Sequence, residues 1–132
     1  MEKIINIGVR LSRDKLIDIE RFIVKEGLHR YRVRPSYFAT LIIKDWLKNP
    51  ILDKSKLTYG YIKNNPKINR ISVNLTEEEH IKLYEIYVKD YIRECSSINV
   101  LIYNVITQFL DEDTQSSIYK RLGLEWFIWD FH

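Results

Sequence analysis

Two short sets of polar residues alternate with apolar residues in this 132-residue chain: Asn6, Gly8 and Arg10, and Arg70, Ser72 and Asn74. Arginine can donate two hydrogen bonds to the edge of guanine, and asparagine can donate to and accept from adenine. The two sets therefore carry side chains suited to nucleobase recognition. The alternative is that they are only the solvated residues of two amphipathic strands.

The charge of the chain divides near Lys67. Residues 1–67 contain 15 Lys and Arg against 7 Asp and Glu, a net charge of +8, whereas the remainder contains 6 against 11, a net charge of −5. A basic segment favours a polyanionic partner, because neutralised phosphates release their condensed counterions. A basic face that is merely solvated would have the same composition.

Residue patterns of catalysis are not found in the sequence. His29, His80 and His132 have no cysteine or carboxylate at metal-ligand spacing, and the chain has no glycine-rich phosphate loop and no G-x-S-x-G motif. The acidic run at 77–79 suits the start of a helix. We therefore expect a non-catalytic protein without a metal, a cofactor or a small-molecule substrate.

The cellular compartment of the protein is indicated by three features that the sequence lacks. The single Cys95 permits no intrachain disulfide, no apolar run approaches the roughly 20 residues that span a membrane, and no targeting leader opens the chain. We expect a cytoplasmic protein.

The first polar set belongs to a predicted strand that is followed by two helices. Apolar and polar residues alternate strictly from Ile5 to Leu11, which predicts a half-buried strand. Ser12 is a candidate N-cap of an amphipathic helix that ends at Gly27. After the basic stretch 29–34, Pro35 lies in the first turn of a second helix, which ends before Asn49 and Pro50.

The same order of elements recurs about 64 residues later. Arg70 to Leu75 alternate as a second strand, Thr76 and Glu79 form a capping box, and Ser97 caps the second helix that follows this strand. The repeat divides the chain into a first unit (1–49), a linker (50–67), a second unit (68–112) and a C-terminal extension (113–132).

The segments Asn6–Ser12 and Arg70–Thr76, each followed by two amphipathic helices, resemble the ribbon-helix-helix repressors of plasmids, phages and bacteria. The resemblance covers about two thirds of the chain, and the tandem form is similar to regulators encoded by viruses of archaea. The chain departs from the family in a longer loop between the helices of each unit and in its C-terminal extension.

The resemblance implies an α+β, mostly helical fold in which the two units form an intrachain pseudo-dimer around a two-stranded antiparallel ribbon. An isolated unit would leave a strand edge unpaired. The inner face of the ribbon would be formed by apolar residues 7, 9, 11, 71, 73 and 75. With Gly8 opposite Ser72 at its centre, Asn6 would lie beside Asn74, and Arg10 beside Arg70.

The same resemblance implies a sequence-specific regulator of transcription, a repressor or an activator, that inserts its ribbon into the major groove of double-stranded DNA. The six outer-face residues would contact bases, and the starts of the second helices would contact phosphates. The phosphate-contacting positions would be Arg30, Arg32, Arg34, Ser36, Ser97 and Asn99. Because the arginines precede only the first of these two helix starts, we expect the protein to bind the DNA backbone more strongly on that side than on the other. Gly8 would permit close approach of DNA or mark a bulge.

The C-terminal extension predicts a short helix over 114–122, followed by an aromatic cluster that includes Trp126, Phe127, Trp129 and Phe131. The cluster either docks on the chain's own helices or mediates self-association or partner binding. It therefore leaves a second function open, that of an antitoxin-like protein-interaction module.

Overall fold

The computed structural model describes residues 3–60 and 68–111, which form an α+β, mostly helical fold with a two-stranded antiparallel sheet. The strands and α-helices follow one another as β1 (Ile4–Ser12), α1 (Arg13–Lys25), α2 (Pro35–Trp46), β2 (Ile68–Thr76), α3 (Glu77–Ile86) and α4 (Ile98–Asp111). Short 3-10 turns η1 (Leu28–Tyr31) and η2 (Lys54–Lys56) and a π-helical turn η3 (Tyr87–Tyr91) complete the order. The aromatic cluster predicted near the C-terminus lies outside the described residues.

The two strands pair in one continuous register, from Ile4 opposite Thr76 to Ser12 opposite Ile68. Gly8 lies opposite Ser72 at the centre, so the predicted register is confirmed. Because no residue is inserted at Gly8, a bulge does not explain that glycine. The pairing joins two segments of one chain, as the repeat in the sequence predicted.

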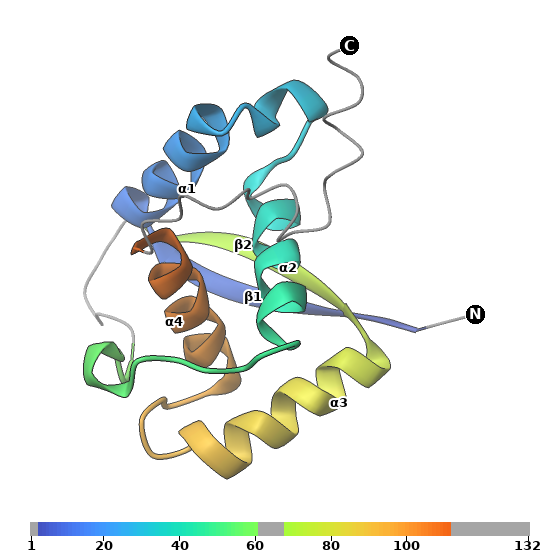
Figure 1. Ribbon diagram of the computed structural model, residues 1–132, viewed down its shortest axis with the longest axis vertical. Coiled ribbons are helices and arrows are strands. Elements are labelled where there is room, and N and C mark those ends of the chain that lie inside the picture. The colour runs from blue at the N-terminus through green and yellow to red at the C-terminus, as the bar shows by residue number, and fades with distance from the viewer. Residues whose placement is uncertain (1–2, 61–67, 112–132) are drawn as a thin grey trace.

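One face of the sheet is buried beneath the helices. The six apolar side chains of this face are 0–7% exposed: Ile7, Val9, Leu11, Ile71, Val73 and Leu75. Figure 1 shows α2 and α4 lying over the paired strands, with α1 and α3 on opposite sides of them. Strict alternation along each strand sends every second side chain into this core and the others away from it.

Capping side chains start three of the α-helices, two of them directly where a strand ends. The Ser12 hydroxyl accepts from the Lys15 N–H at 3.2 Å. In the second repeat, the Thr76 hydroxyl accepts from the Glu79 N–H at 3.2 Å, and the Glu79 carboxylate accepts from the Thr76 N–H at 2.9 Å, which confirms the capping box. The Ser97 hydroxyl likewise accepts from the Val100 N–H at 3.3 Å.

Gly27 and Pro35 lie at the helix ends where the sequence predicted them. Gly27 has φ of 74°, a left-handed conformation that glycine adopts without strain, and it follows the C-cap of α1. Pro35 is the first residue of α2. The helix ends at Trp46, slightly before the predicted stop at Asn49 and Pro50.

Three aromatic rings join the helices above the sheet. The Phe22 and Phe38 centroids lie 5.4 Å apart, and Phe109 approaches each of these rings to 5.9 Å in an edge-on arrangement. These residues come from α1, α2 and α4, so helices from the two described segments, 3–60 and 68–111, contribute to one core. Their edge-to-face packing is a favourable geometry for aromatic pairs.

The described part of the predicted linker packs on the second repeat. The Asn104 side chain of α4 accepts from the Thr58 N–H and donates to the Thr58 carbonyl, both at 2.8 Å. Gln108 pairs in the same two-way manner with the backbone of Asp53 at 2.9 Å. Leu52 is buried as well. Residues 50–60 are held on α4 by hydrogen bonds that the sequence did not indicate.

Candidate nucleic-acid interface

The face of the sheet opposite the helices carries the predicted base-contacting residues. Asn6, Arg10, Arg70 and Asn74 are exposed, and Gly8 and Ser72 between them are partly exposed. The continuous register places all six on one surface. The structure therefore brings together two sets of residues that are at least 60 positions apart in the sequence.

Two arginines occupy one end of this outer face. Arg10 and Arg70 are directly opposite each other in the register. Within residues 3–60 and 68–111, neither of them forms an ion pair. Like charges at directly opposed strand positions repel. Among the described residues, the positive charge at this end of the sheet is therefore uncompensated, and a bound anion or an electronegative base edge would relieve the repulsion.

Two asparagines occupy the other end. The Asn6 side-chain amide donates to the Asn74 side-chain oxygen at 2.8 Å. In this pair the Asn6 oxygen and the Asn74 amide nitrogen are left for other partners. One acceptor and one donor side by side are the combination that the major-groove edge of adenine requires.

Gly8 gives space to an arginine from the other strand. A Cβ atom on Gly8 would lie 3.1 Å from Cδ and 3.2 Å from Nε of Arg70, which is closer than ordinary van der Waals contact. The side chain of Arg70 thus extends over Gly8 along the outer face. From the sequence, close approach of DNA or a bulge could explain a glycine at this position. The structure gives a further explanation, which is that a side chain at position 8 would crowd Arg70.

Ser36 and Asn99, two of the predicted phosphate contacts, bind the edges of the sheet. The Ser72 N–H donates to the Ser36 hydroxyl at 3.0 Å, and the Asn99 amide donates to the Gly8 carbonyl. Thus α2 binds β2, and α4 binds β1. Sequence reasoning missed this role because the partners are 36 and 91 residues apart and meet only in the packed fold.

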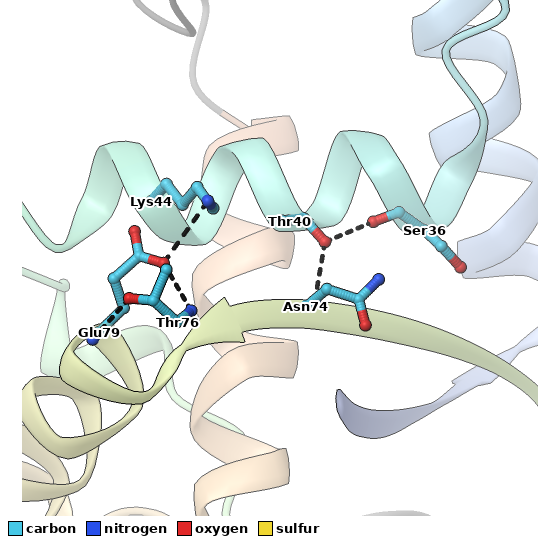
Figure 2. A network of polar contacts seen from close by, with 6 residues as sticks. All are labelled: Ser36, Thr40, Lys44, Asn74, Thr76 and Glu79. Atoms are coloured by element: carbon cyan, nitrogen blue, oxygen red, sulfur yellow. Dashed lines mark hydrogen bonds and ion pairs between the residues drawn. The ribbon is translucent and has the colours of Figure 1, made fainter. Parts of the chain in front are cut away.

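A row of polar side chains spaced four residues apart fixes α2 along β2 (Figure 2). After Ser36, Thr40 accepts from the Asn74 N–H at 3.1 Å and donates to the Ser36 carbonyl at 2.9 Å. Lys44 then forms an ion pair with Glu79 at 3.5 Å. The row runs from the centre of β2 to the cap of α3, so it sets the position of the β2 residues that face outward.

The predicted phosphate-contacting arginines precede α2 in the chain. Arg30, Arg32 and Arg34 are exposed, and Arg34 immediately precedes the helix. The corresponding residue before α4 is Ser97, an uncharged helix cap. Several exposed arginines therefore precede α2 in the chain, whereas an uncharged cap precedes α4.

Other kinds of site find no support in the described part of the chain. No group of three or more His, Cys, Asp or Glu side chains is placed to hold a metal ion there. None of the helices in the described ranges combines the length and the apolar character needed to cross a membrane. Comparisons of the chain with protein-family models, curated proteins and solved structures give no significant match.

Proposed function

We propose that this chain is a sequence-specific regulator of transcription that inserts its two-stranded sheet into the major groove of double-stranded DNA. The observation that carries the proposal is the outer face of the sheet, where Arg10, Arg70, Asn6 and Asn74 are exposed in one register. A two-stranded ribbon fits the major groove, and Arg and Asn are the side chains that read guanine and adenine there.

The proposal includes the ribbon-helix-helix architecture. Its support is the order strand, helix, helix, which occurs twice, and the antiparallel pairing of the two strands within the chain. The crossed hydrogen bonds of Ser36 and Asn99 make each repeat depend on the other. We infer a pseudo-dimer formed by one polypeptide, in which residues 1–49 and 68–112 take the place of two subunits.

In this proposal phosphates bind at the starts of α2 and α4. Free backbone N–H groups and the helix dipole attract anions at such positions. Arg30, Arg32 and Arg34 would strengthen the contact at α2. The Ser36 hydroxyl accepts from the sheet, but a hydroxyl that accepts one hydrogen bond can still donate another.

A mobility-shift assay at two salt concentrations tests the proposal. The full chain should retard double-stranded DNA, and its affinity should fall steeply as the salt concentration rises, because counterions are released on binding. Sites selected from random DNA should then survive an excess of unselected competitor. A chain that retards no DNA even at low salt is not a DNA-binding regulator.

One observation favours a different function, that of a protein-interaction module. Ile81, Tyr84, Val88 and Ile92 are 46–55% exposed and lie along α3, η3 and the residue after it. Scattered exposed apolar residues are ordinary, but a row of them marks a candidate contact surface. In this alternative the C-terminal aromatic residues would contribute to partner binding, and the mobility-shift assay would detect no complex.

A further inference from the structure

The backbone of the sheet has a two-fold axis that its outer side chains do not obey. A rotation about the midpoint of the Gly8–Ser72 pair exchanges residues that are 64 positions apart, such as Asn6 with Arg70 and Arg10 with Asn74. Each exchange replaces an amide with a guanidinium or the reverse. Two identical subunits would place one arginine at each end, whereas this chain places both at the same end.

The two ends consequently offer different chemistry to DNA. At one end, Arg10 and Arg70 present two guanidinium groups without a carboxylate partner in the described ranges. At the other end, Asn6 and Asn74 form a neutral, hydrogen-bonded amide pair. Guanidinium groups match the two acceptors of guanine, whereas an amide matches the donor and acceptor of adenine.

The same axis exchanges the starts of α2 and α4, which also differ. Arg34 immediately precedes α2, and Ser97 immediately precedes α4. Two residues earlier, Arg32 is exposed, whereas its counterpart Cys95 is fully buried. The residues before α2 and α4 therefore break the two-fold symmetry as well, independently of the outer side chains of the strands.

We infer that one molecule of this protein binds DNA in a single orientation, at a site whose core is not palindromic. The inference rests on the proposed function and names the class of target: guanine contacts gather at the end of the core that faces Arg10 and Arg70, and adenine contacts at the opposite end. The arginines before α2 hold one flank of the site more firmly than the other.

Selection of binding sites from random DNA by the full chain is the first test. We expect a non-palindromic consensus, with interference by guanine N7 methylation confined to one half of the core. Replacing either half of the core with the inverted copy of the other half should weaken binding by roughly 5- to 150-fold, the effect of one or more lost base contacts. A palindromic consensus centred under one molecule would overturn the inference alone, whereas a failure to select any DNA would overturn the proposed function with it.

A charge-neutral exchange is the sharper test. Arg70→Asn combined with Asn74→Arg would make the four outer Arg and Asn positions two-fold symmetric, because Asn6 would then be exchanged with asparagine and Arg10 with arginine; only the small central pair, Gly8 and Ser72, would still differ. Both substituted side chains are exposed, so the fold should persist, as circular dichroism would verify. This variant should select a palindromic core.

The matched control adds Asn6→Arg and Arg10→Asn to that pair, which moves both arginines to the opposite end. The variant with all four substitutions should again select a non-palindromic core. The guanine and adenine ends of that core should now be exchanged relative to the flank of the site that the arginines before α2 protect. If the variant with only Arg70→Asn and Asn74→Arg selects the same non-palindromic core as the original chain, these four residues do not set the orientation of the protein on DNA.

Discussion

Arg10 and Arg70 face each other across the strands although like charges repel at such positions. Arg10→Ala should therefore leave the free energy of unfolding unchanged or raise it slightly. Affinity for the selected DNA site should fall by about 1–3 kcal/mol, and affinity for random DNA should change much less. Titrations of both DNAs against each variant measure the difference.

Arg34→Ala is the informative comparison for Arg10→Ala. Its contact would be with phosphate, so affinity should fall to a similar extent on selected and random DNA, and the salt dependence should become shallower. Lys48→Ala, beyond the other end of α2, removes the same charge and is the control. Equal losses on both DNAs for Arg10→Ala would exclude that residue from base recognition.

Gly8 lies beneath the Arg70 side chain, and this contact makes its replacement informative. Gly8→Ala should leave stability unchanged or raise it by up to about 1 kcal/mol, because glycine weakens a strand. Affinity for the selected site should nevertheless fall, since the new methyl group displaces Arg70. In a double-mutant cycle with Arg70→Ala, the loss caused by Gly8→Ala should largely disappear. An undiminished loss would mean that the methyl group obstructs DNA directly.

At the scale of elements, the polar row on α2 determines how the helix lies against β2. Thr40→Val removes the acceptor of the Asn74 N–H, and unfolding free energy should fall by about 1–3 kcal/mol. Thr107 on α4 supplies a matched control, because its hydroxyl is buried and unpaired among the described residues. Thr107→Val should be neutral or stabilising in urea unfolding. Equal destabilisation by both variants would show that the hydrogen bond of Thr40 contributes nothing.

The turn after α3 should make stability sensitive to alkaline pH. Burial raises the pKa of the Tyr87 and Tyr91 hydroxyls and of the Cys95 thiol. The folded state therefore keeps protons that the unfolded state loses first, so stability is constant below about pH 8 and falls as pH rises through about 9–11.

Urea unfolding from pH 7 to pH 10.5 measures this effect. Tyr87→Phe loses the hydrogen bond from Tyr87 to the Cys95 carbonyl, so it should be less stable at pH 7 but lose less stability on the way to pH 10.5. Tyr37→Phe, at a side chain 48% exposed on α2, is the control for general effects of the substitution. Stability that stays constant up to pH 10.5 would contradict the prediction.

At the scale of the whole molecule, pairing of the two strands within one chain predicts folding without association. The melting temperature should be the same across a hundredfold range of protein concentration, because no dimerisation contributes to stability. Sedimentation should detect folded monomer at the lowest concentration. Loss of helical circular dichroism together with dissociation on dilution would mean that strands pair between chains instead.

The sequence predicted the sheet better than it predicted the contacts that hold the sheet in place. Alternation of period two and the repeat at 64 residues were sufficient for the strands, their register and the caps at Ser12 and Thr76. The bonds of Ser36 and Asn99 to the opposite strands were missed. Local patterns report which side chains are buried, whereas these bonds join residues that only three-dimensional packing brings together.

The hydrogen bonds from α2 and α4 to the sheet also affect how molecules of this protein behave towards one another. A two-stranded sheet has two open edges, and unpaired N–H and C=O groups on such edges recruit strands from neighbouring molecules. Here Ser36 and Thr40 occupy N–H groups on the outer edge of β2, and Asn99 occupies a carbonyl on the outer edge of β1. The same side chains that align the helices thereby oppose aggregation through strand addition at the centre of each edge.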